Sequence, residues 1–522
     1  MNSAVTSRRR LLVGGAAAVT ATAAAQVVGS ASAQAAPVTY TPNAYPTTLV
    51  PNYKQLHYMN RLGCGYSPTT FEQMRAAGSV STWLNKQLST TPPAESPIAQ
   101  AVPSWFPNLE HSPTLMWSNV VNRSRVSWDY SRDLANLTML RRIYSTRPVF
   151  ENLVEFWSNH LHIYANADLA WVPRASYDKV IRKHALGRFE DMLVEAALHP
   201  AMLLYLDNWK SAKGAPNENQ GRELLELHTL GRGSGYTEQM VKDSAKILSG
   251  YTVDAKATWA AYYDATKHTT GPVKVLEFSA ANDLSDGQEL AKQYLRFLAR
   301  HPATARNIAT KLARYFVSDK PSESLVNTVA QAFLNSGTDI KTTLRALVAH
   351  PDFIASRGTL TRTTTEDVIA TARVLGITAK APTSREAFVN KLTQVTHTDA
   401  IYHWPRPNGS PRGDDNWCTA GRMLDTFRMH WRFAAGWWPT QDVTYRTGAT
   451  WLPQPSIRLD QYVDHLCRVL LGRVSNARIL TAAVTATGFG PATLITKDHL
   501  VSRSAFVRLV GTLLDSPEHM RR

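Results

Sequence analysis

Apolar side chains recur every three to four residues along most of this chain, a period that is typical of α-helices. The first such run covers residues 56–62, ends at Gly63 and Gly65, and is followed by Ser67-Pro68, a pair that can start another helix. Alternating, strand-like patterns are few, and a β-hairpin is expected only within residues 248–278. The sequence therefore predicts a mainly α protein: a large multi-helix globular bundle with long loops and at most a small β-hairpin insertion.

Several helix boundaries carry the same pair of residues, a His or Ser followed by Pro. Proline suits the first helical position because its missing N–H would have no partner there. The side chain before it can then cap the helix. We therefore expect capping roles at His199-Pro200, His301-Pro302, His350-Pro351 and Ser516-Pro517.

The N-terminus has the three parts of an export signal. Ser7-Arg8-Arg9-Arg10-Leu11-Leu12 precedes an apolar run, and Ala31-Ser32-Ala33 offers a small-residue cleavage site. Adjacent arginines are typical of the twin-arginine route. We expect residues 1–33 to be this signal, residues 34–52 an extended lead-in, and residues 53–522 a single large helical domain, with two lobes as the alternative. The protein would be secreted or cell-wall associated. No membrane anchor is expected after cleavage, because no later run has about 18 uncharged apolar residues.

The charge balance points to anionic surroundings. The formal net charge is +16, and loss of the three arginines in the signal lowers it to +13. A basic exported protein favours anionic cell-wall or extracellular polymers. No run of five or six like charges and no basic-aromatic signature is present, so no nucleic-acid partner is expected. The sequence has three cysteines, Cys64, Cys418 and Cys467, whose spacing fits no metal or disulfide pattern and identifies no bridged pair. The sequence does not define the oligomeric state.

The segment VFENLVEFWSNHLHIYAN is the first candidate for chemistry. In a helix that runs through His160, Glu155, Asn159 and His160 occupy neighbouring positions. His162 lies about 200° from His160 on a helix, but the two share a face in an extended stretch. His160 would be a ligand or a general base, His162 a further metal ligand, and Asn159 a substrate contact. A purely structural role is the alternative.

The second candidate is GRELLELHTLGRG. Glu223 and Glu226 lie three residues apart and share a helical face, whereas His228 points about 160° away from Glu226. Two carboxylates on one partly buried face repel each other unless a metal, a shared proton or an arginine lies between them. The arginine candidates from a later helix are Arg306 and Arg314. Motifs of serine hydrolases, phosphate-binding loops, zinc proteases and c-type haem attachment are absent from the sequence.

Taken together, these segments resemble the bacterial domain-of-unknown-function family 1800, a group of exported, mostly helical proteins. The matching segments are NRLGCGYSP, FWSNHLHI, HALGRFEDMLVEAALHPAMLLYLDN, NENQGRELLELHTLG, GYTEQMVKDSAKILSGYT, HPATARNIATKLARYFV and the proline-glycine loop before Trp417. The resemblance implies export and a helical body but no chemistry. The family motif positions here are Asn159, His160, Asn217, Glu218, Asn219, Arg222, Glu223 and Glu226. Cys64 and His228 depart from the family pattern, which argues against a general reactive role for either.

Two hypotheses follow. In the first, the protein is an extracytoplasmic enzyme acting on a cell-wall or extracellular polymer. Its catalytic residues would be His160, Glu223 and Glu226, which would also hold a divalent metal if one is bound. Its substrate contacts would be Asn159, Asn219 and Arg222. In the second, the protein is a non-catalytic, basic wall-associated binding or scaffold protein whose polar network only fixes helix packing. Contact between His160 and Glu223 at an open pocket would favour the enzyme, and carboxylates paired with arginines would favour the scaffold.

Overall fold

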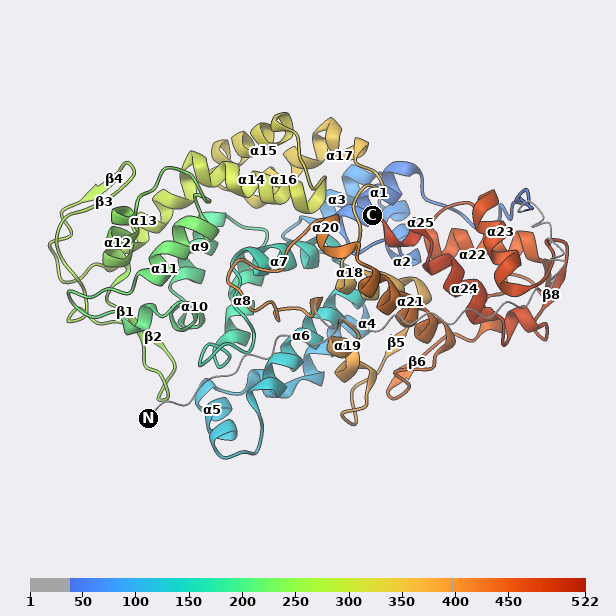
Figure 1. The fold of residues 1–522 in the computed structure, drawn as a ribbon, viewed down its shortest axis with the longest axis horizontal. Helices are drawn as coiled ribbons and strands as arrows, with labels where there is room; N and C mark the ends of the chain where they lie inside the picture. The colour runs from blue at the N-terminus through green and yellow to red at the C-terminus, as the bar shows by residue number, and fades with distance from the viewer. Residues whose placement is uncertain (1–37, 397–398) are drawn as a thin grey trace, which may run out of the picture. The chain divides into compact units, whose positions relative to one another are not determined.

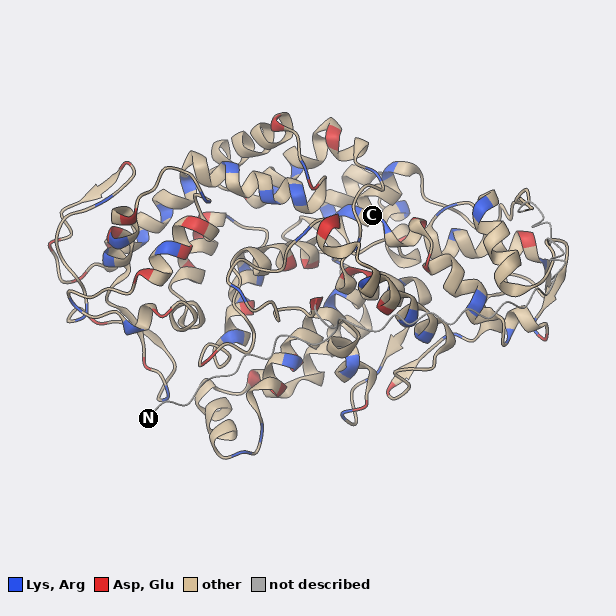
Figure 2. Cartoon of the chain, viewed as in Figure 1, with Lys and Arg blue, Asp and Glu red and all other residues tan. Residues whose placement is uncertain are grey.

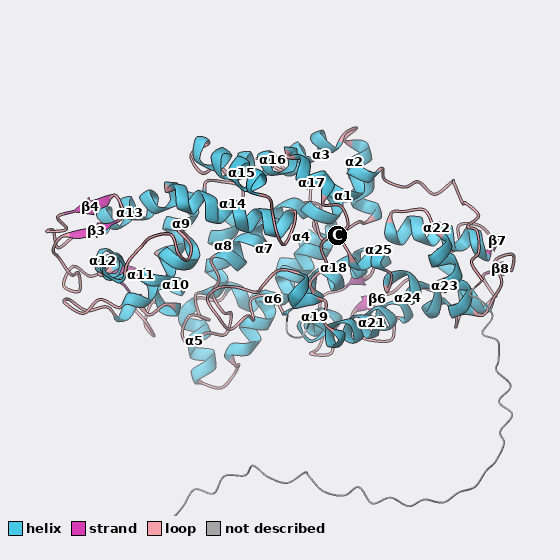
Figure 3. Cartoon of the chain, turned by 45° about the horizontal axis from the view of Figure 1, so that its top comes forward, coloured by secondary structure: helices cyan, strands magenta, loops and turns pink. Residues whose placement is uncertain are grey.

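The structure is a computed structural model that describes residues 38–396 and 399–522, so the expected export signal lies outside the described residues. Contacts group Tyr40–Arg522 into one compact unit. Helices make up most of this unit, and the strands form only short two-stranded ladders (Figure 3). The predicted mainly α class is therefore confirmed. No described helix has both the length and the hydropathy needed to cross a bilayer.

The described part of the first half of the chain contains helices α1 to α12 (Figure 1). They are α1 (Tyr53–Leu62), α2 (Pro68–Ala76), α3 (Val80–Gln87), α4 (Pro97–Ala101), α5 (Pro113–Val121), α6 (Ser127–Tyr144), α7 (Pro148–His160), α8 (Arg174–His184), α9 (Phe189–Ala197), α10 (Pro200–Tyr205), α11 (Glu218–Glu223) and α12 (Glu238–Leu248). A π-helical turn, Leu224–His228, continues α11.

The second half forms the remaining helices. They are α13 (Gln288–Arg300), α14 (Pro302–Phe316), α15 (Glu323–Asn335), α16 (Ile340–Ala349), α17 (Pro351–Ala355), α18 (Thr364–Leu375), α19 (Phe388–Thr396), α20 (Asp414–Trp417), α21 (Ala420–Ala435), α22 (Leu459–Leu471), α23 (Ala477–Thr487), α24 (Phe506–Leu514) and α25 (Pro517–Met520).

Four antiparallel ladders complete the described part of the fold. The region in which one hairpin was expected forms two, β1 (Tyr251–Val253) with β2 (Ala261–Tyr263) and β3 (Val273–Val275) with β4 (Phe278–Ala280). The other two ladders join distant segments, β5 (Thr378–Ala379) with β6 (Val443–Thr444) and β7 (Ser456–Arg458) with β8 (Leu494–Thr496).

The His-Pro junctions begin helices as expected. The Nδ1 atoms of His199, His301 and His350 accept hydrogen bonds of 3.1, 3.1 and 3.2 Å from the backbone N–H two residues later. Each ring thus satisfies one of the N–H groups that a helix start leaves unpaired. Ser516 occupies the same position before α25 without a side-chain cap. The capping prediction is confirmed for the three histidines.

Helix α7 lies near the middle of the fold and packs on α1, α3, α6 and α8 (Figure 1). Leu153, Val154 and Trp157 on this helix are fully buried. The end of α7 is therefore tightly packed; His160 is its last residue, and His162 lies two residues beyond it.

Helix α11 approaches α12 closely because Gly221 faces it. A Cβ atom at Gly221 would lie 2.9 Å from the backbone nitrogen of Ala245 and 3.0 Å from the carbonyl oxygen of Val241. Both neighbours are backbone atoms, so they cannot move aside as a flexible side chain would. This glycine is required by packing.

We predict that Gly221→Ala lowers the free energy of unfolding by about 1–3 kcal/mol, because the clash outweighs the better helix propensity of alanine. Gly421→Ala is the matched control, since that glycine also lies in a helix but has no atom within 4 Å of the position that a Cβ would take. The control should be neutral or more stable by up to about 1 kcal/mol. Urea unfolding measures both, and equal stability of the two variants would contradict this account of the α11–α12 contact.

Candidate functional site

The π-helical turn Leu224–His228 is closed by side chains from other helices. A helix end leaves carbonyl oxygens without partners, and π-turns are frequent at functional sites. Here three side chains from α7 and α14 donate to three successive carbonyl oxygens. The pairs are Lys311 Nζ to Leu227 O at 2.8 Å, His160 Nε2 to His228 O at 3.0 Å, and Asn307 Nδ2 to Thr229 O at 2.7 Å. These donors dock the end of the α11 segment onto the two helices.

Both ring nitrogens of His160 are in use. Nε2 donates to the carbonyl oxygen of His228, and Nδ1 accepts from Lys311 Nζ at 3.1 Å. Burial, with Lys311 and His228 nearby, lowers the pKa of His160 well below its ordinary value, so the ring is neutral. Burial also lowers the pKa of Lys311 to about 8, and no carboxylate pairs with this lysine among the described residues. His160 therefore acts here as a cap that Lys311 holds in place.

The two predicted carboxylates lie apart from His160. Glu226 forms an ion pair with exposed Arg232 and accepts a hydrogen bond from Tyr236 Oη at 3.4 Å. Glu223 is half-buried and has no hydrogen bond or ion pair within the described residues. Burial raises the pKa of Glu223, and Glu226 raises it further. No contact joins either glutamate to His160 in the described part of the chain, so the three expected metal ligands do not form a group.

The two arginines expected opposite the glutamates lie elsewhere. Arg306 pairs with Glu323 at the surface, and Arg314 is exposed. The cation that lies opposite Glu226 in the structure is Arg232, a loop residue close to it in sequence. A loop partner of this kind has no helical spacing from which it could be predicted.

The predicted substrate contacts on α11 have other neighbours. The Arg222 guanidinium donates two hydrogen bonds of 2.7 Å to the carboxylate of Glu238 and lies 3.4 Å from Glu218. Arg222 therefore ties α11 to the start of α12. Asn219 is exposed, and its backbone N–H donates to the capping side chain of Asn217.

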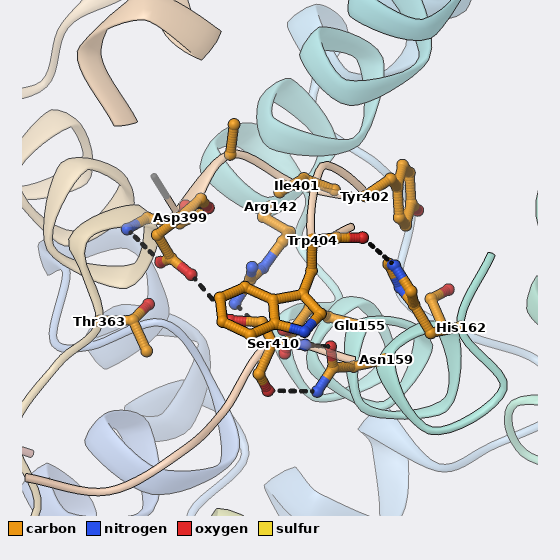
Figure 4. Close-up of a pocket in the computed structure, with 13 residues that line it drawn as sticks. Arg142, Glu155, Asn159, His162, Thr363, Asp399, Ile401, Tyr402, Trp404 and Ser410 are labelled. Atoms are coloured by element: carbon orange, nitrogen blue, oxygen red, sulfur yellow. Dashed lines mark hydrogen bonds and ion pairs between the residues drawn. The ribbon is translucent and has the colours of Figure 1, made fainter. Parts of the chain in front are cut away.

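Asn159 and His162 hold the loop of residues 399–413 against the end of α7 (Figure 4). Asn159 pairs with the backbone of Ser410 in both directions, with its Oδ1 accepting at 2.7 Å and its Nδ2 donating at 3.0 Å. His162 Nε2 donates to the carbonyl oxygen of Trp404 at 2.8 Å. The two residues thus act on one loop, while His160 faces α14.

A cavity of about 40 Å³ lies between this loop, α6, α7 and the start of α18 (Figure 4). Arg142, Glu155 and Asp399 supply its charged lining. Burial raises the pKa of Asp399, whose carboxylate accepts from the Thr365 N–H at 2.8 Å. The volume accommodates about three water molecules. A sugar unit would not fit without movement of the loop.

The cavity borders a network of buried charges, since Glu155 belongs to both. Arg412 from the loop pairs with Glu155 on α7 and, at 3.0 Å, with Glu366 on α18. Glu366 also forms an ion pair with Arg522 at 3.2 Å. Burial alone would raise the pKa of Glu366, but Arg522, Arg412 and Arg142 lower it to about 2. The network joins four segments that are distant in sequence. No local spacing in the sequence connects Arg412, Glu366 and Arg522, so their meeting could not be predicted.

One group in the described residues has the composition of a metal site. Ligand atoms of Asp367 on α18, His430 on α21 and His519 on α25 lie within 4.8 Å of one another. No short motif could have revealed this group, because its members are spread over three distant helices.

A larger groove lies at the surface near the end of α21. Its volume is about 690 Å³, and its walls come from residues 434–449 and 497–507. Three basic residues, Arg446, Lys497 and Arg503, line it together with Trp437 and Tyr445, and none of the described residues that line it is acidic. Elsewhere in the fold, basic and acidic positions are interleaved along the ribbon (Figure 2). The groove therefore has the charge and the volume to accept an anionic ligand.

We predict that Lys311→Met removes one pH-dependent contribution to stability. In the folded protein the pKa of Lys311 is lowered from 10.5 to about 8. Between these two pH values the unfolded chain binds a proton that the folded chain does not, so stability rises with pH, by at most about 1.4 kcal/mol per pH unit. Urea unfolding over this range should give a smaller rise for the variant than for the native protein. If the free energy of unfolding rises equally with pH in both proteins, Lys311 is not buried without a carboxylate partner.

Comparison with known families gives one result. The family described as "Protein of unknown function (DUF1800)" matches residues 57–521. No significant match was found to a curated protein or to a solved structure. The match covers nearly all of the described fold, from α1 to α25. This chain belongs to the DUF1800 family.

Proposed function

We propose that this protein is an exported, basic binding protein that holds an anionic extracellular or cell-wall polymer in the groove lined by Arg446, Lys497 and Arg503. The observation that carries the proposal is the groove itself, in which three cations face an open volume without an acidic neighbour in its described lining. The polar residues of α7 and α11 would then serve mainly to fix the packing of the helices. Export rests on the N-terminal sequence pattern.

The groove cations are available for a ligand. Lys497 and Arg503 are exposed, and neither has an ion pair within the described residues. Arg446 is held in place, since its guanidinium lies 3.7 Å from the ring centroid of Trp451 and donates to the carbonyl oxygen of Thr450 at 2.8 Å. A guanidinium fixed in this way loses less side-chain entropy on binding an anion.

Exposed tryptophan adds a second kind of contact. Trp437 is 63% exposed and Trp431 is 38% exposed, although tryptophan side chains are usually well buried. Their rings contact each other at a centroid distance of 6.3 Å. A flat aromatic face beside cations suits a ligand that carries both apolar C–H faces and negative charge. A polysaccharide with a carboxylate on each sugar unit has both features.

The binding test uses polygalacturonate and its methyl-esterified, neutral form. The triple variant R446Q/K497Q/R503Q should bind polygalacturonate at least about tenfold more weakly, because each lost ion contact contributes roughly 0.5–1 kcal/mol. The control K54Q/K86Q/K213Q loses the same net charge at exposed lysines outside the groove and should bind within about twofold of the native protein. Native binding should weaken with added salt and be lost on the neutral polymer.

Either of two results would overturn the groove assignment. Equal losses in the two triple variants would show that net charge alone governs binding. Undiminished binding by the groove variant would place the polymer elsewhere.

The second candidate function is the enzymatic one, hydrolysis of such a polymer with Glu223 as an acid. It is favoured by one observation, the half-buried and unpaired state of Glu223 beside a π-turn. A carboxyl group with a raised pKa is suited to donate a proton. If the native protein depolymerises an extracellular polymer, Glu223→Gln should lower the rate at least about a hundredfold and leave polymer binding unchanged. A variant as active as the native protein would exclude this role for Glu223.

A further inference from the structure

Three ionisable side chains meet in the core between α18, α21 and α25. Asp367 and His430 are completely buried, and His519 is 3% exposed. Asp367 Oδ1 lies 3.4 Å from His430 Nε2 and 3.6 Å from His519 Nε2. Ligand atoms bound about 2.0–2.2 Å from a tetrahedral ion are separated by similar distances. The carboxylate oxygen thus lies at tetrahedral ligand spacing from both imidazole nitrogens, and all three ligand atoms lie within 4.8 Å of one another.

Two of the three atoms lack hydrogen-bond partners. Among the described residues, neither Asp367 Oδ1 nor His430 Nε2 takes part in a bond of acceptable geometry, although both atoms are buried. Buried polar atoms without partners are rare, because each costs about 1–3 kcal/mol. The two atoms also face each other. Their shared position is one that a cation would satisfy.

His430 has a carboxylate at its second ring nitrogen, as metal-binding histidines commonly do. This nitrogen, Nδ1, lies 2.7 Å from Asp515 Oδ1. A carboxylate at this position fixes the orientation of the ring and leaves Nε2 free to bind a metal. His519 Nε2 forms a 3.0 Å hydrogen bond with Thr371 Oγ1, which metal binding at this nitrogen would replace.

We propose that Asp367, His430 and His519 bind one divalent transition-metal ion of the zinc class. Two imidazoles and a carboxylate suit zinc better than calcium or magnesium, which take mainly oxygen ligands. Because the group is buried, the ion would be structural. It would connect α18, α21 and the C-terminal α25, and α21 ends at the groove, where Ala434 and Ala435 form part of the wall.

The competing arrangement has a proton in place of the metal. A protonated His430 would then lie between Asp367 and Asp515, while Arg422 pairs with the other oxygen of Asp367 at 3.3 Å. That arrangement would satisfy the charges without an ion. Metal content separates the two, because only the metal site binds zinc in a fixed ratio to the protein.

The experiment measures metal in protein purified without chelators and reconstituted with zinc. We expect about one zinc ion per chain in the native protein and none in the variants Asp367→Asn and His519→Gln. His268→Gln is the matched control, since His268 is equally buried but hydrogen-bonds to Ser249 and Asn282, and it should keep the ion. Cobalt substitution should give visible absorption bands typical of tetrahedral coordination.

A second readout does not depend on the variants folding. A strong zinc chelator should lower the Tm of the native protein, and added zinc should restore it. The proposal is wrong if reconstituted native protein holds no stoichiometric zinc, or if its Tm is unchanged by the chelator. It is also wrong if Asp367→Asn binds as much zinc as the native chain.

Discussion

The ion-pair network around Arg412 and Glu366 is the interaction on which the rest of the structure depends. Buried charges are stable only when they are paired, because each loses several kcal/mol of hydration. In this protein the partners come from α7, the loop of residues 399–413, α18 and the C-terminal Arg522. No two of these segments are adjacent in sequence. The charges can therefore be paired only when all four segments have assembled, which links the N-terminal half of the fold to its last residue.

This network also determines what the end of α7 can do. With Arg412 held by Glu155 and Glu366, the loop lies over α7, and Asn159 and His162 bind its backbone. His160 is left to face α14, where it and Lys311 bind carbonyl oxygens of the π-turn. The polar side chains of Asn159, His160, His162 and Lys311 thus bind one another or the backbone. We infer that ligand binding takes place at the surface groove beyond α21, where Lys497 and Arg503 are exposed and have no ion pair within the described residues.

Local features of the fold could be predicted from the sequence. The mainly α class and the capping histidines before prolines depend on residues close together in the chain. The expected shared face of Glu223 and Glu226 assumes a regular helix. The structure instead has a π-turn after Glu223, which changes the angles between successive side chains. A single local change of helix type therefore altered the geometry of the candidate site.

Other parts of the site depend on tertiary contacts that no spacing encodes. Lys311 caps the π-turn from α14, and the groove combines Arg446 with Lys497 and Arg503. A sequence pattern shows that such residues are basic but not which of them converge.

The most direct test of this account is a crystal structure of the protein with a short galacturonate oligomer. We predict electron density for the oligomer in the groove, with carboxylates at Arg446, Lys497 and Arg503 and a sugar ring on Trp437. Density at Glu223 and Glu226 would contradict the claim that the polar residues of α7 and α11 are structural. Density anywhere outside the groove would contradict the claim that the groove is the binding site.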